Sequence, residues 1–340
     1  DTLVRRWRAV SAHSNATILQ TSFVTPLERP FGQFEHRVSH STQSIFAALN
    51  RRLGEEARAR ASTFVCDLDF VAASLGKTRW FDDRLWTLAK TPCSLECLPH
   101  LVQAIADIVC ASRGSVVKCV VLDLDNTLWG GVIGDDGLEG IRLGHLGDGE
   151  AFVAFQAYLK QLPARGILLA VCSKNEREAA LLPFTDHADM VLRREDIAVF
   201  VANWDNKADN IRHIQEILNI GFDSMVFLDD NPVERQIVME NLPEVTVPNL
   251  PDDPAEWLEY LYGLNLFETA SYSGTDAERT RQYQEEASRH LLSKKYTNVD
   301  EFLKSLAMKS YVRPFREFDV PRVAQLSQRS NQFNLQGSRR

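Results

Sequence analysis

The stretch VVKCVVLDLDNTLWGGVIG, residues 116–134, decides how the chain folds. Residues 116–122 are mostly apolar and rich in valine, which is typical of a strand buried on both faces of a parallel sheet. The run stops at two acids, Asp123 and Asp125. Because open α/β sheets bind ligands beyond the carboxyl ends of their strands, this placement predicts a reactive site. The alternative is a solvated loop after a core strand.

Other polar residues occur at equivalent points later in the chain. Ser173 follows the apolar run 167–172, and Asp229 and Asp230 follow the run 224–228. Lys207 lies at the start of a predicted helix. Each of these residues alone is weak support for a site, because a lone Lys or Ser is usually solvated. Together and in this order they predict a phosphate site with carboxylates, a hydroxyl and a cation.

Apolar runs and helical patterns alternate after residue 114, which favours a doubly wound parallel sheet. The flap, residues 129–143, has two interpretations. Its glycines would let the backbone approach a substrate that Trp129 covers, or Trp129 packs on the sheet in a hairpin. The expected helices are 148–165, 175–183 and 205–218, and the expected strands are 167–172, 190–192, 224–228 and 244–247.

The first third of the chain predicts a smaller α/β unit. Residues 1–20 show little apolar periodicity beyond a short helical candidate and are expected to be frayed or a linker, whereas residues 41–61 and 95–112 have amphipathic helical patterns. The run TFVCDLD, residues 63–69, imitates the D-x-D strand end. We interpret it as a decoy, because Val71 stands where the pattern requires Thr.

Composition sets limits on function. The chain has 340 residues and a net charge of −8, which argues against general nucleic-acid binding. It contains no apolar stretch of membrane-spanning length. The cysteines lack metal-site spacing, so reduced thiols in a cytoplasmic protein are expected. The first residue is not Met, which suggests an excised domain or a processed chain.

The D-x-D-x-T strand end resembles the first motif of the haloacid-dehalogenase (HAD) superfamily of phosphatases. The longer string LDLDNTLWGGVIGDDG, residues 122–137, resembles the FkbH-like family within it. The resemblance implies a HAD-like doubly wound parallel sheet without a large cap. It implies four segments: a non-catalytic SGNH-like unit over 1–112, the phosphatase domain over 114–262, helices over 263–306, and the start of a truncated GNAT-like domain over 307–340.

The resemblance also implies the site roles. Asp123 would be the phosphoryl nucleophile and Asp125 its acid and base, while Mg²⁺ would offset the charge of the phosphate. The phosphate-binding residues would be Thr127, Ser173 and Lys207. The metal ligands would be Asp123, Asp230 and the backbone carbonyl of Asp125, with Asp229 as a near neighbour.

FkbH-like proteins are associated with polyketide assembly, which suggests a function. The enzyme would take a phosphoglyceryl group from 1,3-bisphosphoglycerate onto a Cys, remove the 3-phosphate, and pass the glyceryl unit to an acyl carrier protein. The gaps between the motifs hold no cap-sized domain, so the site is expected to be open to a tethered substrate. The alternatives are a plain phosphatase without acyl transfer, and a docking module with a vestigial site.

The expected acyl carrier is Cys172. It ends the strand next to that of Asp123, and adjacent strands lie about 4.8 Å apart. Lys174 and Lys207 nearby would favour its thiolate. The alternative is a core Cys, because side chains alternate along a strand and Ser173 would then face the phosphate instead.

Overall fold

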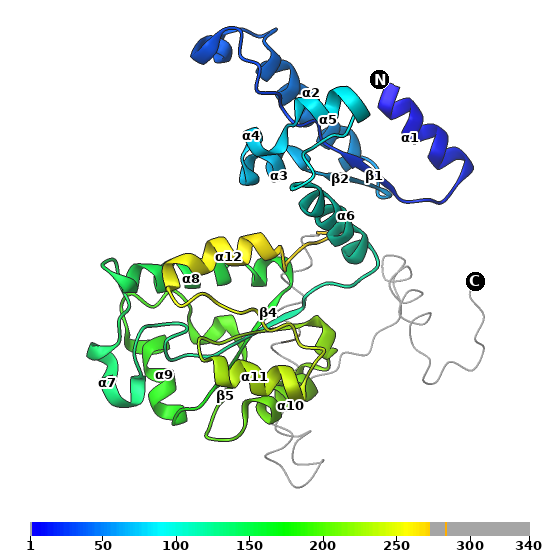
Figure 1. Ribbon diagram of the computed structural model, residues 1–340. Coiled ribbons are helices and arrows are strands. Elements are labelled where there is room, and N and C mark those ends of the chain that lie inside the picture. Colours follow the sequence, from blue (N-terminus) through cyan, green and yellow to red (C-terminus); the bar gives the residue numbers. More distant parts are fainter. Residues whose placement is uncertain (1, 273–282, 284–340) are drawn as a thin grey trace, which may run out of the picture. The chain divides into compact units, whose positions relative to one another are not determined.

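The computed structural model describes residues 2–272 and residue 283. Within these residues the chain forms a two-stranded and a four-stranded sheet, each with parallel neighbours and covered by helices (Figure 1). The predicted α/β class with a parallel sheet is therefore confirmed. No helix in this part of the chain combines the length and the apolar character needed to cross a membrane.

The four-stranded sheet has the order β5-β4-β3-β6. The central strand β3 pairs with both neighbours, so that Leu122 lies opposite Val171 of β4 and Leu228 of β6. The three strands therefore end side by side, and the residues that follow them share one edge of the sheet. The strands are β3 (Cys119–Leu122), β4 (Leu168–Ser173), β5 (Ile197–Ala202) and β6 (Met225–Leu228).

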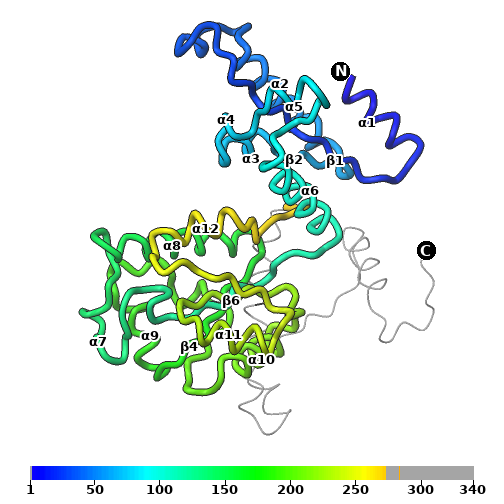
Figure 2. Tube along the Cα trace, viewed as in Figure 1, coloured from blue at the N-terminus to red at the C-terminus, as the bar shows by residue number. Residues whose placement is uncertain are grey.

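Both faces of this sheet are covered, which explains why its strands are continuously apolar. Val120 and Leu122 face one core, shared with α8 and α12, and Cys119 and Val121 face the other, shared with α10 and α11. In Figures 1 and 2, α8 and α12 run side by side, and the ring of Trp257 from α12 packs edge-on against Phe155 of α8. The elements are α7 (Ile133–Gly140), α8 (Asp148–Leu159), η2 (Pro163–Arg165), α9 (Arg177–Asp186), η3 (Arg194–Asp196), α10 (Lys207–Leu218), η4 (Phe222–Ser224), α11 (Pro232–Asn241), η5 (Pro254–Glu256) and α12 (Trp257–Leu264).

The N-terminal region has its own small sheet and cores. Residues 2–20 are more ordered than the expected frayed end or linker, because the helical candidate forms the helix Thr2–His13 and its Trp7 is buried against Leu53 and Ala57. The residues 41–61 and 95–112 contain the expected helices, one capped by Ser41. The elements are α1 (Thr2–His13), β1 (Ile18–Thr21), η1 (Gly32–Arg37), α2 (Thr42–Arg58), β2 (Thr63–Cys66), α3 (Leu68–Leu75), α4 (Lys77–Trp80), α5 (Asp83–Ala89) and α6 (Leu98–Ser112).

Two strand predictions need correction. Residues 190–192 are not a strand, because the backbone N–H groups of Val191 and Leu192 donate to the side chain of Gln156 instead of to a neighbouring strand. The strand next to β4 at this edge of the sheet is β5, an apolar run that the sequence patterns did not single out. At 244–247 only a bridge to β6 forms, in which Thr246 N donates to Met225 O and Thr246 O accepts from Phe227 N.

The domain limits remain a proposal. The sequence boundary at 112–114 falls between the end of α6 at Ser112 and the start of β3 at Cys119, and α12 extends past residue 262 to Leu264. Residues 273–282 and 284–340 lie outside the described residues. They include most of the expected helical segment and the entire expected GNAT-like start.

The flap packs on the domain instead of standing free. Trp129 is fully buried, and its ring meets Phe184 of α9 edge-on, with the centroids 6.1 Å apart. Gly130 forms a two-way backbone bridge with Arg142, which closes the flap. The structure thus agrees with the hairpin interpretation of Trp129. The flap's only helix among the described residues is α7.

We expect Gln156→Ala to destabilise the fold strongly. The Gln156 carboxamide is fully buried, donates to Leu128 O, and accepts from Val191 N and Leu192 N. Removing it leaves buried backbone groups unpaired at about 1–3 kcal/mol each. Urea denaturation should show that the free energy of unfolding falls by several kcal/mol. The control is Gln161→Ala, an exposed residue just after the end of α8, which should lower it by less than about 0.5 kcal/mol. Equal losses in the two variants would contradict this role of the Gln156 hydrogen bonds.

Candidate active site

Three aspartates and one lysine meet at the carboxyl edge of the four-stranded sheet. Asp123 follows β3, Asp229 and Asp230 follow β6, and Lys207 is the first residue of α10. Nζ of Lys207 lies 3.0 Å from Asp123 Oδ1 and 2.5 Å from Asp229 Oδ2. Asp123, Asp229 and Lys207 are all buried. The structure therefore brings together the cation and the carboxylates that the sequence placed at separate strand ends and a helix start.

The two acids after β6 are held rigidly by their neighbours. Asp229 Oδ1 accepts from Asn231 N, and the guanidinium of Arg235 donates to the backbone oxygens of Asp229 and Asp230. Thr127 donates its hydroxyl to Asp230 Oδ1 and accepts from Asp230 N. These contacts use the fully buried Thr127 hydroxyl to position Asp230, so its predicted phosphate contact stays a prediction.

Crowding of like charges shifts the acid–base properties of this cluster. Burial and the charge of Asp123 raise the pKa of Asp229 to about 7, against the opposing effect of Lys207. The same causes raise the pKa of Asp230. Burial alone would lower the pKa of Lys207, but the carboxylates of Asp123 and Asp229 raise it above its ordinary value. One cation thus faces three carboxylates that together carry more negative charge than it can balance.

The arrangement of the cluster suits a divalent cation. Carboxylate oxygens of Asp123, Asp229 and Asp230 lie within 4.8 Å of one another. Oδ1 of Asp123 is buried and accepts no hydrogen bond, although it lies close to Lys207. Hard oxygen donors with excess negative charge are what Mg²⁺ and Ca²⁺ bind. The residues present therefore fit the predicted metal.

Asp125 lies in the flap-side half of the site. Its Oδ1 accepts from the indole Nε1 of Trp129 and from Ile133 N, each at 3.0 Å. Its Oδ2 accepts from Nδ2 of Asn175 at 2.8 Å, and the same amide nitrogen lies 3.2 Å from Ser173 Oγ. Asp125 and Ser173 are thus connected through one buried amide.

Sequence reasoning missed three residues that organise the site, which are Trp129 as a hydrogen-bond donor, Asn175 and Arg235. The strings SKN and NPVER contain two of them beside predicted site residues. That proximity was the only available signal, because donors to a carboxylate can be recognised only once the chain is folded. Next to Ser173, Lys174 forms an ion pair with Glu234 of α11, with Nζ 2.6 Å from Oε1. This pair joins the loop after β4 to α11, the helix that follows β6.

The position of Cys172 differs from the expectation. Its side chain is fully buried in the core between β4 and α10, and its Sγ lies 3.7 Å from Lys207 O. Burial raises the pKa of this thiol, despite the nearby Lys207. The cause is strand alternation, by which Ser173 and Cys172 point to opposite faces. The expectation that the Cys172 sulfur lies at the mouth of the site was wrong. The acyl-carrier role of Cys172 stays an untested prediction, which this placement disfavours.

The decoy acids of the N-terminal unit have local partners. Asp67 caps α3 by accepting from Phe70 N, and it also accepts from Ser22 Oγ. Asp69 pairs with Lys77 at 2.8 Å and accepts from Thr25. Hydrogen bonding and the charge of Lys77 outweigh burial and lower the pKa of Asp69. Asp67 and Asp69 thus each have hydrogen-bond donors of their own, unlike the crowded acids after β3 and β6.

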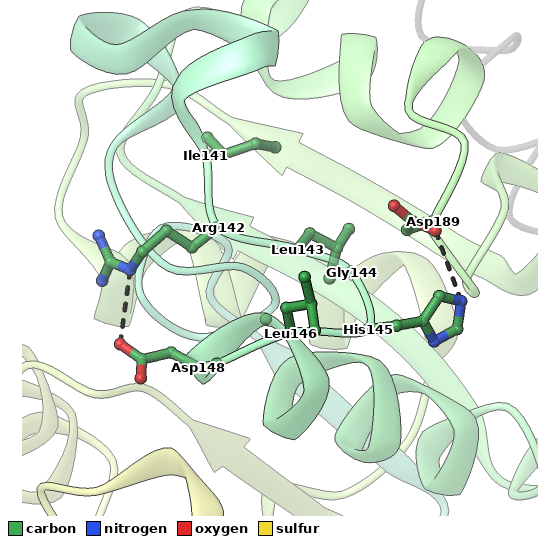
Figure 3. A pocket seen from close by; sticks show the side chains of 10 residues that line it. Ile141, Arg142, Leu143, Gly144, His145, Leu146, Asp148 and Asp189 are labelled. Carbon is green, nitrogen blue, oxygen red and sulfur yellow. Dashed lines mark ion pairs between the residues drawn. The ribbon is translucent and has the colours of Figure 1, made fainter.

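A shallow hollow lies beside the flap, between residues 141–149 and Asp189 (Figure 3). Two ion pairs cross it, Arg142 with Asp148 at 3.6 Å and His145 with Asp189 at 3.7 Å. None of the predicted site residues lines it. Each of its two acids already contacts a basic side chain of the same hollow.

Comparisons with known proteins agree with this geometry. The family model "FkbH, N-terminal domain" matches residues 1–110. The N-terminal part of a Bacteroides fragilis protein, which contains a phosphatase domain and was crystallised in complex with Mg, is 46% identical with a TM-score of 0.76, and the match covers 80% of this chain and 73% of that one. A HAD-superfamily hydrolase of subfamily IA from Geobacter sulfurreducens is 12% identical with a TM-score of 0.28, over 42% of this chain and 99% of its own. No curated protein matched the chain.

The Bacteroides match combines high identity with coverage of most of both chains, and the family model matches the residues that precede the four-stranded sheet in sequence. Identity of that size is sufficient to assign the family as well as the fold. The protein therefore belongs to the FkbH-like family of the HAD superfamily.

Proposed function

We propose that the protein is an Mg²⁺-dependent phosphatase with Asp123 as its nucleophile. The observation that carries the proposal is the cluster at the sheet edge, where Lys207 contacts both Asp123 and Asp229. The family assignment and the phosphatase domain of the Bacteroides relative support the same reaction. The intact donor set argues against a vestigial docking module.

The proposed reaction has two steps with Asp125 in opposite roles. A carboxylate oxygen of Asp123 attacks phosphorus, the bond from phosphorus to the leaving oxygen breaks, and Asp125 gives its proton to that oxygen. Water then attacks the phosphorus atom of the phosphorylated Asp123 and gives a proton to Asp125. The bond between Asp123 and phosphorus breaks, which releases phosphate and restores both carboxyl groups.

The remaining residues bind the phosphate and the metal in this proposal. Lys207 and the Ser173 hydroxyl would contact phosphate oxygens, since both are buried beside the reacting carboxylates. Asp123 and Asp230 would bind Mg²⁺ with the backbone carbonyl of Asp125, and Asp229 would stay paired to Lys207. When bound, Mg²⁺ would screen the phosphate charge from the attacking carboxylate.

We further propose that the phosphate is the 3-phosphate of a glyceryl unit bound to protein. An enzyme thiolate would attack the acyl carbon of 1,3-bisphosphoglycerate, the bond to the 1-phosphate would break, and an acyl carrier protein thiol would later displace the enzyme thiol. The family and its N-terminal match support this proposal, as does a flap with no element larger than α7 in the described residues. Free cysteines are the basis for proposing a cytoplasmic location.

We expect Asp123→Asn to abolish phosphate release, because an amide cannot form the phosphorylated intermediate. The loss should be at least about a thousandfold, or about 4 kcal/mol at about 1.4 kcal/mol per factor of ten. Phosphate release from p-nitrophenyl phosphate measures it. Asp186→Asn, an exposed change at the end of α9, is the control. Near-normal turnover by Asp123→Asn would refute the nucleophile.

Chelation with EDTA should stop phosphate release, and Mg²⁺ should restore it. Binding should also raise the melting temperature, because a ligand at about one hundred times its Kd stabilises the native state by about 2.7 kcal/mol. Thermal unfolding with and without Mg²⁺ measures this independently of activity. Asp230→Asn should lose most of the increase. Full activity in EDTA, or an increase that Asp230→Asn retains, would contradict the metal assignment.

Mixing the protein with 1,3-bisphosphoglycerate should give a covalent adduct by intact-mass analysis. In the wild type the adduct should lose its phosphate, whereas in Asp123→Asn the phosphorylated form should accumulate. Peptide mapping identifies the acylated Cys, and Cys172→Ala tests the residue expected from the sequence. Active phosphatase with no adduct would instead favour a plain phosphatase.

A further inference from the structure

We infer that Trp129 and Asn175 are positioning residues that orient the Asp125 carboxyl group so that Oδ2 is the atom that exchanges protons with the substrate. The inference rests on the proposed function, in which Asp125 acts as acid and base. It assigns roles to an indole in the flap and to an amide that follows β4.

Oδ1 of Asp125 is fully occupied. It accepts from the Trp129 indole and from Ile133 N, each at 3.0 Å. A carboxylate oxygen offers about two lone-pair sites, so two donors leave none for a proton. Both donors come from the flap, which fixes this oxygen on the flap side of the site.

Oδ2 keeps one free position. Its donor within the described residues is Nδ2 of Asn175, at 2.8 Å. The same nitrogen lies 3.2 Å from Oγ of Ser173, the proposed phosphate-binding hydroxyl. Asn175 therefore holds Oδ2 beside the expected phosphate and leaves its second lone pair for the proton that is transferred.

These donors are themselves held in place. Trp129 is fully buried, and its ring packs edge-on against Phe184. Asn175 is 3% exposed. Buried indole N–H groups commonly have a hydrogen-bond partner, and that of Trp257 donates to the backbone oxygen of Pro251 at 2.7 Å. Trp129 instead donates to a carboxylate beside the nucleophile.

The test is the dependence of Trp129→Phe on the leaving group, with Mg²⁺ present. An alkyl phosphate needs a proton on its leaving oxygen, whereas p-nitrophenyl phosphate has a stable leaving anion. We compare kcat/KM, which reports the steps up to departure of the leaving group and excludes the hydrolysis step that both esters share. We expect kcat/KM to fall at least about tenfold on the alkyl ester, which is part of the roughly 10²–10⁴ that a positioned acid contributes, and less than about threefold on the aryl ester. Trp257→Phe is the matched control, because it also removes a buried indole N–H and should show no difference between the esters.

Asn175→Ala leaves the aromatic core intact and should show the same leaving-group dependence, so the inference stays testable if Trp129→Phe fails to fold. On an Asp125→Asn background, Trp129→Phe should add no further loss if it acts through Asp125. Equal losses on both esters, or full additivity with Asp125→Asn, would overturn the inference. A wild type inactive on both esters would instead contradict the proposed phosphatase.

Discussion

The ammonium group of Lys207, held between Asp123 and Asp229, is the interaction around which the phosphatase domain is arranged. Parallel pairing makes it possible, because β3 and β6 end at the same level and deliver their next residues to one edge. The neighbouring α10 starts at this edge and brings the cation. Without the lysine, the buried carboxylates of Asp123 and Asp229 would lie beside the partly buried Asp230 with no ammonium group to oppose their charge, which is costly in a medium of low dielectric constant.

The sequence was informative where chemistry coincides with strand ends. Asp123, Ser173, Asp229 and Asp230 were found because each follows an apolar run, and Lys207 because it begins a helix. The strand β5 was missed because residues 190–192 look equally apolar, and only the bonds of Gln156 show that they are not in the sheet. Periodicity records burial, but it does not say which backbone groups are paired with another strand.

The side chains that orient the site were harder to predict. Cys172 and Ser173 are adjacent, yet strand alternation sends one to the core and the other to the site, and the sequence left this choice open. The donors to Asp125 come from the flap and from the loop after β4. The Asn175 amide reaches Asp125 across 50 residues of sequence, and the Trp129 indole reaches it through the conformation of the flap, so hydrophobic patterns carry no record of either contact. Gln156 shows the same limit, because a glutamine in a helix usually faces solvent.

The carboxylate cluster also has a consequence for how the protein evolves. Asp229 is buried beside another acid, an arrangement that opposes folding whenever no metal is bound. An amide at this position would relieve the repulsion and is within reach of a single base change. A lineage that no longer needed the reaction would therefore gain stability by losing an acid. Under the proposed phosphatase function, the three acids exchange stability of the fold for the negative charge that binds the metal.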